Sequence, residues 1–116
     1  MKNTSVVDTT SKYIVKSIGI GSEDDQKMIE TSDGFGAVKL EGGDTDSKVS
    51  LIECYHLIEG TGTMTISAGD ETLPLTGKGK YGLRPGQLKF GNDEQFTLTT
   101  DGNVTSYLLV TEFRRN

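Results

Sequence analysis

Turn signals recur at short, nearly regular intervals along this sequence and divide it into short β-prone runs. Gly69-Asp70 and Asp101-Gly102 are two such signals, the second predicts a hairpin turn, and the run 104–113 follows it. Short strands at this spacing are typical of an antiparallel sandwich or barrel, whereas βαβ units need longer helical segments. The 15 glycines suit many tight turns. We therefore predict an all-β fold.

The strongest strand signal is the segment 49–58, which is β-prone and nearly all apolar. One parity carries Glu53 and Tyr55 between aliphatic residues, and the other carries Cys54 and His56. Both parities are mostly apolar, which predicts a strand that is covered on both sides.

Weaker signals outline the rest of the chain. Further strands are expected over residues 13–18, 37–40, 63–67, 72–75, 87–90, 95–100 and 104–113. Pro74 places its strand at a sheet edge. Residues 77–86 are expected to form a glycine-dense connection with a type II turn at Pro85-Gly86. Acidic residues after a capping Ser22 predict at most one short helix near the N-terminus, within residues 22–29.

Length and composition limit the domain organisation and the partners. Residues 1–12 are polar and are expected to form a loose leader, and residues 13–116 one domain of common size. The net charge is −5 and there is no basic stripe, so neither nucleic acid nor a membrane is expected as a partner. One cysteine, no membrane-length apolar run and no signal-peptide core predict a cytoplasmic protein.

Two motifs carry a family resemblance. The segment 53–66, ECYHLIEGTGTMTI, resembles the first conserved motif of cupins, and the stretch 75–86, which ends in Arg-Pro-Gly, is similar to the second. The resemblance covers residues 49–113. It implies a cupin-like antiparallel β-barrel, or jelly roll, with a ligand site inside the barrel.

The metal ligands that the resemblance implies are missing. The two histidines of the first motif are replaced by Ser47 and Val49, or by Asp46 and Lys48, and the histidine of the second by Lys89. Only Glu53 remains of the four ligands, and one carboxylate does not hold a divalent ion where three or four ligands are needed. We therefore expect no metal and no cofactor.

The candidate ligand-binding residues are Glu53, Tyr55, Lys89 and Met64. Glu53 and Tyr55 share a parity that would line the cavity, and Lys89 stands, by resemblance, where an inward-facing ligand stood. A Glu53–Lys89 pair would be either a structural ion pair or a polar anchor for a ligand. Tyr55 would either stack on a sugar or pack in the core.

Three other features leave alternatives open. His56, the only histidine, lies on the parity opposite to Glu53 and is expected outside the cavity, at the other sheet layer or an interface; a catalytic role would need an orienting partner. Cys54 is expected to be a buried structural thiol. The acidic loop from Glu41 through Asp44 to Asp46 is either solvated or an oxygen-rich calcium site.

Three functions follow. The leading prediction is a metal-free protein that binds a small molecule, a sugar or an organic acid, without catalysis. The second is a metal-independent carbohydrate isomerase or epimerase. The third is a structural or interaction module that forms a homodimer through an apolar outer face, made of Ile52, Cys54, His56 and Ile58.

Overall fold

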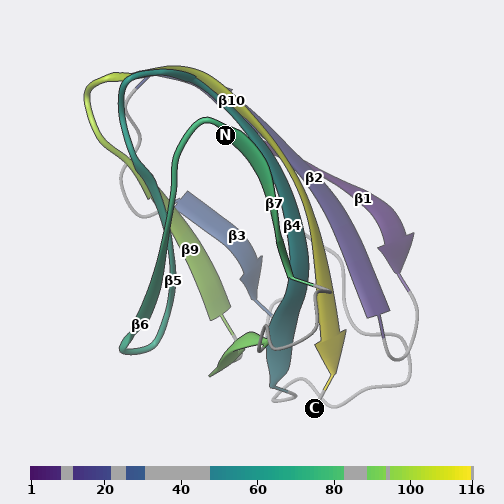
Figure 1. Ribbon diagram of the computed structural model, residues 1–116. Coiled ribbons are helices and arrows are strands. Elements are labelled where there is room, and N and C mark those ends of the chain that lie inside the picture. Colours follow the sequence, from purple (N-terminus) through teal and green to yellow (C-terminus); the bar gives the residue numbers. More distant parts are fainter. Residues whose placement is uncertain (9–11, 22–25, 31–47, 83–88, 94, 116) are drawn as a thin grey trace.

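The computed structural model describes residues 1–8, 12–21, 26–30, 48–82, 89–93 and 95–115 (Figure 1). All regular structure in these segments is β-strand. In chain order the strands are β1 (Lys2–Asp8), β2 (Lys12–Ile20), β3 (Gln26–Glu30), β4 (Val49–Gly60), β5 (Met64–Ala68), β6 (Glu71–Leu75), β7 (Lys78–Gly82), β8 (Phe90–Asp93), β9 (Gln95–Thr100) and β10 (Val104–Arg115).

The strands form two antiparallel sheets. The large sheet has six strands in the order β1-β2-β10-β4-β7, with β8 also paired to β4, and the small sheet has four in the order β3-β9-β5-β6. The sheets face each other across the core (Figure 1). The predicted all-β antiparallel fold is confirmed, and the layout is of the barrel or jelly-roll kind. In the part of the chain that the structure describes, no helix could span a membrane.

Two of the turns that carry the chain from one sheet to the other are linked by a carboxylate. The turn after β4 leads from the large sheet to β5 of the small sheet, and the turn after β9 leads back to β10. The Asp101 carboxylate ties them together, because it accepts hydrogen bonds from the backbone N–H of Thr63 and of Asn103, each at 2.9 Å. Asp101-Gly102, predicted as a hairpin turn, is therefore a crossing. Gly69-Asp70 is a turn, as predicted, and it joins the paired strands β5 and β6.

Most of the predicted strands are confirmed: β2, β4, β5, β6, β9 and β10 cover the expected segments, and β8 begins at the end of its segment. β6, with Pro74, is an edge strand as expected. The expected strand 37–40, the acidic loop Glu41–Asp46 and the Pro85-Gly86 turn lie outside the described residues.

Three predictions about polar segments are wrong. Gln26–Glu30, expected within a short helix, is β3, which pairs with β9 and buries Met28 completely. Most of the expected leader is β1, the edge strand beside β2. The glycine-dense connection contains β7, which pairs with β4. All three strands lie at sheet edges, where backbone pairing with a distant segment stabilises a sequence of low strand propensity.

Large side chains fill the space between the sheets. Phe96 of the small sheet makes edge contacts with Phe90 and Phe113 of the large sheet, at centroid distances of 6.1 and 4.9 Å. Other fully buried side chains are Tyr13, Val15, Met28, Leu51, Met64, Ile66, Leu98 and Leu109. The core of the described residues is therefore packed with apolar groups, and Met64 is one of them.

A bulge in β4 changes which side chains face the core. Opposite β10, Glu53 pairs with Glu112 but Leu51 pairs with Phe113, so Ile52 is an extra residue in β4. Before it Leu51 is fully buried, and after it the buried residues are Cys54, His56 and Ile58. A bulge of one residue reverses the alternation of faces beyond it. Glu53 and Tyr55 consequently point outward, which corrects their expected position in the interior.

Candidate binding face

The pairing register shows which side chains are neighbours on the outer face of the large sheet. One row runs across five strands, from Lys2 through Ile18, Leu108 and Leu57 to Lys78. We call it the apolar row. It consists of three aliphatic side chains between two lysines, one at each edge of the sheet. Its Ile18 is 39% exposed.

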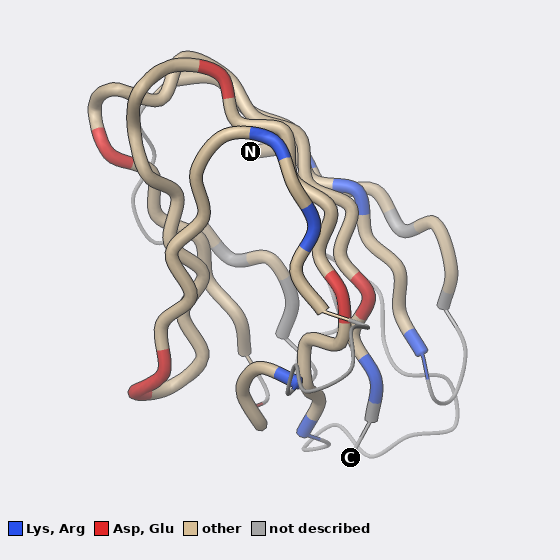
Figure 2. Tube along the Cα trace, viewed as in Figure 1, with Lys and Arg blue, Asp and Glu red and all other residues tan. Residues whose placement is uncertain are grey.

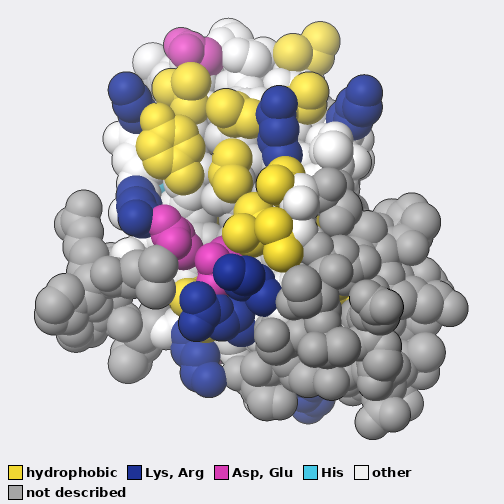
Figure 3. Space-filling model, turned by 90° about the vertical axis from the view of Figure 1, so that its right-hand side faces the viewer, with side chains coloured by type: hydrophobic (Ala, Val, Ile, Leu, Met, Phe, Trp, Pro, Cys, Tyr) yellow, Lys and Arg dark blue, Asp and Glu magenta, His cyan; other side chains and the backbone are white. Residues whose placement is uncertain are grey.

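Two further rows follow along the strands. The next contains Thr4, Lys16, Val110, Tyr55 and Lys80, and the one after it Ile14, Glu112, Glu53 and Gly82. Hydrophobic side chains gather in the upper part of this face, with basic side chains around them and an acidic pair below (Figure 3). The acidic pair also lies in the middle of the sheet in Figure 2. The face thus has an apolar half and a charged half.

A small hollow marks the charged half. Ile14, Glu53, Tyr55, Val110 and Glu112 line it, and its volume is about 190 Å³. We call it the carboxylate hollow. It lies below the roughly 300–1,000 Å³ of pockets that hold drug-sized ligands. A single ring-sized group is therefore the largest guest that suits it.

Each carboxylate of the hollow has its own cation. Glu53 Oε1 lies 2.7 Å from Nζ of Lys80, and Glu112 pairs with Nε of Arg114. Glu53 and Glu112 are directly opposite on adjacent strands, where like charges are destabilising. The two cations offset this repulsion and leave a compact arrangement of two acceptors and two donors.

Tyr55 gives the hollow an aromatic wall. Its side chain is 39% exposed, which is unusual for a large aromatic residue in the middle of a strand. It lies between Val110 and Lys80 in its row. An exposed ring can stack on an apolar face of a ligand while its hydroxyl remains solvated.

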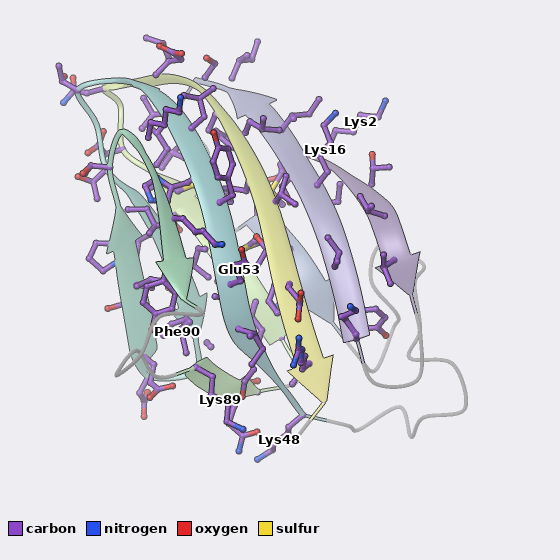
Figure 4. All side chains as sticks on the ribbon, turned by 45° about the vertical axis from the view of Figure 1, so that its right-hand side comes forward. Lys2, Lys16, Lys48, Glu53, Lys89 and Phe90 are labelled. Atoms are coloured by element: carbon purple, nitrogen blue, oxygen red, sulfur yellow. The ribbon has the colours of Figure 1, made fainter. Side chains whose placement is uncertain are left out.

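The structure brings together two of the four predicted ligand-binding residues, Glu53 and Tyr55, but on the outer face. Met64 is fully buried in the core. Lys89 lines a different hollow, of about 400 Å³, with Ser50 and Glu71 among its neighbours. It lies at the lower end of the molecule, well away from Glu53 (Figure 4). The predicted Glu53–Lys89 pair is therefore wrong, and Lys80 takes the place of Lys89.

Lys80, Glu112 and Arg114 were missed by sequence reasoning. Lys78 and Lys80 alternate with Gly79 and Tyr81, and this period of two was the available signal for an edge strand. Glu112 was placed on the final strand, but its pairing with Glu53 depends on the register of two strands that are far apart in sequence. No local pattern reports that register.

His56 is packed inside the fold, which is one of the two positions expected for it. Its side chain is buried, and Nδ1 lies 3.0 Å from the carbonyl oxygen of Gly77, to which it donates in the tautomer protonated at that nitrogen. The ring also packs against Gly79 of β7. It does not line the carboxylate hollow. His56 therefore acts as a structural link between β4 and the start of β7.

Cys54 is buried, as predicted. Burial raises the pKa of its thiol from 9.0 to about 11, the hydroxyl of Thr111 lowers it by donating to Sγ at 3.5 Å, and the charge of Glu53 raises it. The thiol is thus protonated at neutral pH. Among the residues that the structure describes, no three His, Cys, Asp or Glu side chains are grouped so that they could hold a metal ion.

No family model matches the chain, and no curated protein is significantly similar to it.

Proposed function

We propose that the protein binds a sugar, without catalysis, at the carboxylate hollow on the outer face of the large sheet. The observation that carries the proposal is the hollow itself, which is lined by Tyr55, Glu53 and Glu112 together with the aliphatic side chains of Ile14 and Val110. We further propose, from the two sequence motifs, that the chain is a cupin relative whose ligand site lies outside the barrel.

The chemistry of the hollow suits a sugar ring. A pyranose has an apolar C–H face, which stacks on an aromatic side chain, and hydroxyl groups, which donate well to carboxylates. Glu53 and Glu112 supply the acceptors, and Lys80 and Arg114 donate from the rim. An organic acid, the other ligand class considered from the sequence, would meet two carboxylates at once. We therefore favour a neutral sugar or an amino sugar.

The packed core supports a site on the outside. Phe90, Phe96 and Phe113 occupy the space between the sheets, where a cupin ligand would be expected. The isomerase alternative needs a free base beside the substrate. His56, the obvious base, is buried in the core and directed at the Gly77 carbonyl. No observation on the described residues favours catalysis over binding.

The test is a titration with monosaccharides followed by amide chemical shifts. Glucose, galactose and glucosamine are added in the millimolar range to the protein labelled with ¹⁵N. The expected result is a saturable shift confined to residues of β4, β7 and β10 around Tyr55. Tyr55→Ala should weaken binding by roughly 3- to 10-fold, because stacking contributes about 0.5–1.5 kcal/mol.

A matched control keeps this experiment specific. Glu53→Gln retains the shape of the side chain but removes its charge, and should weaken glucosamine binding more than glucose binding. Lys89→Gln changes one charge at the far end of the molecule (Figure 4) and should leave both affinities unchanged. The proposal fails if none of the three sugars shifts these amides, or if Lys89→Gln and Tyr55→Ala weaken binding equally.

A further inference from the structure

The apolar half of the binding face is not explained by a sugar site. Ile18 is 39% exposed and Ile20, two residues further along β2, is 78% exposed. Isolated exposed apolar residues are ordinary. These two, however, continue into Leu108 and Leu57 of the apolar row. A contiguous exposed apolar patch of this kind marks an interaction surface.

A second hollow lies at one end of this patch. Met1, Lys2, Ile18, Gly19 and Ile20 line it, and its volume is about 420 Å³. This volume falls within the roughly 300–1,000 Å³ typical of small-molecule sites. Its lining is mainly aliphatic, with one charged side chain, that of Lys2. We call it the lysine hollow.

Two lysines flank the apolar surface on the same side. Lys2 pairs with Ile18, and Thr4 pairs with Lys16, so Lys2 and Lys16 are diagonal neighbours on adjacent strands. Diagonal neighbours have Cβ atoms roughly 7–8 Å apart. Both side chains extend from the outer face in Figure 4. An anionic group between them can contact both ammonium groups at once.

The described acidic side chains of this face lie elsewhere. Glu53 and Glu112 are in the charged half and pair with Lys80 and Arg114. Glu59 of β4 lies opposite Ser106 of β10, which in turn lies opposite Ile20 of β2. Glu59 is therefore two strands away from Ile20. Among the residues that the structure describes, the charged side chains beside this hollow are therefore the cations Lys2 and Lys16. The two lysines favour an anionic ligand.

A second copy of the chain fits this patch poorly. Two identical faces stack about a two-fold axis that lies in the interface. An axis along the strands through Leu108 would place Lys2 against Lys78 of the other copy, because these residues are at opposite ends of the apolar row. An axis across the strands would place each lysine against itself. Both arrangements bring like charges together. The outer face predicted for a homodimer is wrong as well, because its Cys54, His56 and Ile58 are buried.

We propose that the lysine hollow binds a free anionic amphiphile, with a carboxylate head group between Lys2 and Lys16 and an alkyl chain along Ile20 and Ile18. The apolar row continues the path of the chain toward Leu108. This site is separate from the carboxylate hollow, and the proposal does not depend on sugar binding there.

Sodium dodecanoate, used below its micelle concentration, is the probe. Calorimetric titration should show saturable binding with one site per chain. Dodecyltrimethylammonium, with a similar chain and the opposite charge, should bind at least tenfold more weakly. The double variant Lys2→Gln/Lys16→Gln should lose about tenfold in affinity for dodecanoate. The control Lys48→Gln/Lys89→Gln, which removes the same charge at the far end (Figure 4), should bind as the parent does.

Further measurements separate the alternatives. Ile18→Ser should weaken dodecanoate binding while circular dichroism and the melting temperature show an intact fold. Equal affinity for the two amphiphiles, or an equal loss in both lysine variants, would overturn the proposal. So would binding to phosphatidylcholine vesicles with 30% phosphatidylserine in the absence of dodecanoate binding, since that points to a lipid surface. Sedimentation that shows a dimer abolished by Ile18→Ser, without dodecanoate binding, would assign the patch to a second copy.

Discussion

The Cys54 thiol is protonated in the folded protein over a pH range in which an exposed thiol would ionise. Its side chain is fully buried, and its pKa is raised from 9.0 to about 11. The thiolate, not the thiol, is the nucleophile. We expect dithionitrobenzoate at pH 8 to react with Cys54 only after the protein unfolds. A rapid reaction in native buffer would contradict this burial.

The same pKa difference predicts how stability depends on pH. Above about pH 9 the unfolded chain loses the thiol proton while the folded protein keeps it, so the unfolded state binds fewer protons and stability falls as pH rises. The loss should be complete near pH 11 and should amount to up to roughly 3 kcal/mol. Urea unfolding at several pH values, compared with Cys54→Ala, isolates this contribution from other titrating groups. Parallel curves for the two proteins would refute it.

Asp101 predicts the opposite dependence. Hydrogen bonds from the backbone N–H of Thr63 and of Asn103 lower the pKa of its carboxyl group. Its contribution to stability is present above the ordinary carboxyl pKa and is lost as pH falls through the lowered value. Asp101→Asn should therefore flatten the acid limb of the stability profile. Urea unfolding of both proteins at several acidic pH values measures this, and equal slopes for Asp101→Asn and the parent would contradict it.

Strand β4 shows why the candidate site could be predicted only in part. The sequence indicated a long strand of high β propensity. It also indicated Glu53 and Tyr55 as candidate binding residues whose side chains lie on the same face of that strand. Both parities are apolar enough to face a core, so the side chains alone do not indicate a bulge. The extra residue at Ile52 becomes visible only in the pairing with β10. The prediction therefore found two of the site residues but assigned them to the wrong face.

One position in strand β7, Gly82, requires glycine. Gly82 has φ +98°, and a methyl group there would collide with the carbonyl oxygen of Ile52 at the bulge. Gly82→Ala should destabilise the protein by about 2–4 kcal/mol, the sum of a strained backbone and a displaced strand. Gly77→Ala is the matched control, because Gly77 has φ +60° but a methyl group at that position would have no other atom within 4 Å. In the control, the free energy of unfolding should fall by only about 1 kcal/mol. Denaturant unfolding measures both values.

Phe96 connects the two sheets of the whole molecule. It contacts Phe90 in β8 and Phe113 in β10, and it is fully buried. Phe96→Ala should destabilise the fold by about 3–5 kcal/mol, and the large and small sheets should unfold together. Phe96→Leu, which keeps much of the volume, should lose about 1–2 kcal/mol. Unfolding followed by far-ultraviolet circular dichroism and by tyrosine fluorescence should give one midpoint. Two midpoints would mean that the sheets are not coupled.

The class of fold was predictable because turn spacing and strand propensity are local properties. Gly69-Asp70 is a good example, since its hairpin follows from two adjacent residues. Which strands pair is not local. The change of sheet at Asp101 and the edge pairing of β1, β3 and β7 depend on segments far apart in sequence. These contacts decide which side chains share a face, and the binding face therefore emerged only from the folded molecule.

The extra residue in β4 also affects how this segment is compared with other proteins. An alignment without a gap across residues 49–58 pairs each position with a counterpart of the same parity, although the faces are exchanged beyond Ile52. A relative in which the same residues form a regular strand without the bulge would carry its acidic and aromatic side chains toward the interior and its thiol and imidazole toward solvent. Loss of the Ile52 codon, by contrast, would remove the bulge and leave Glu53 and Tyr55 on the outer face, because Leu51 and Glu53 already pair with successive residues of β10.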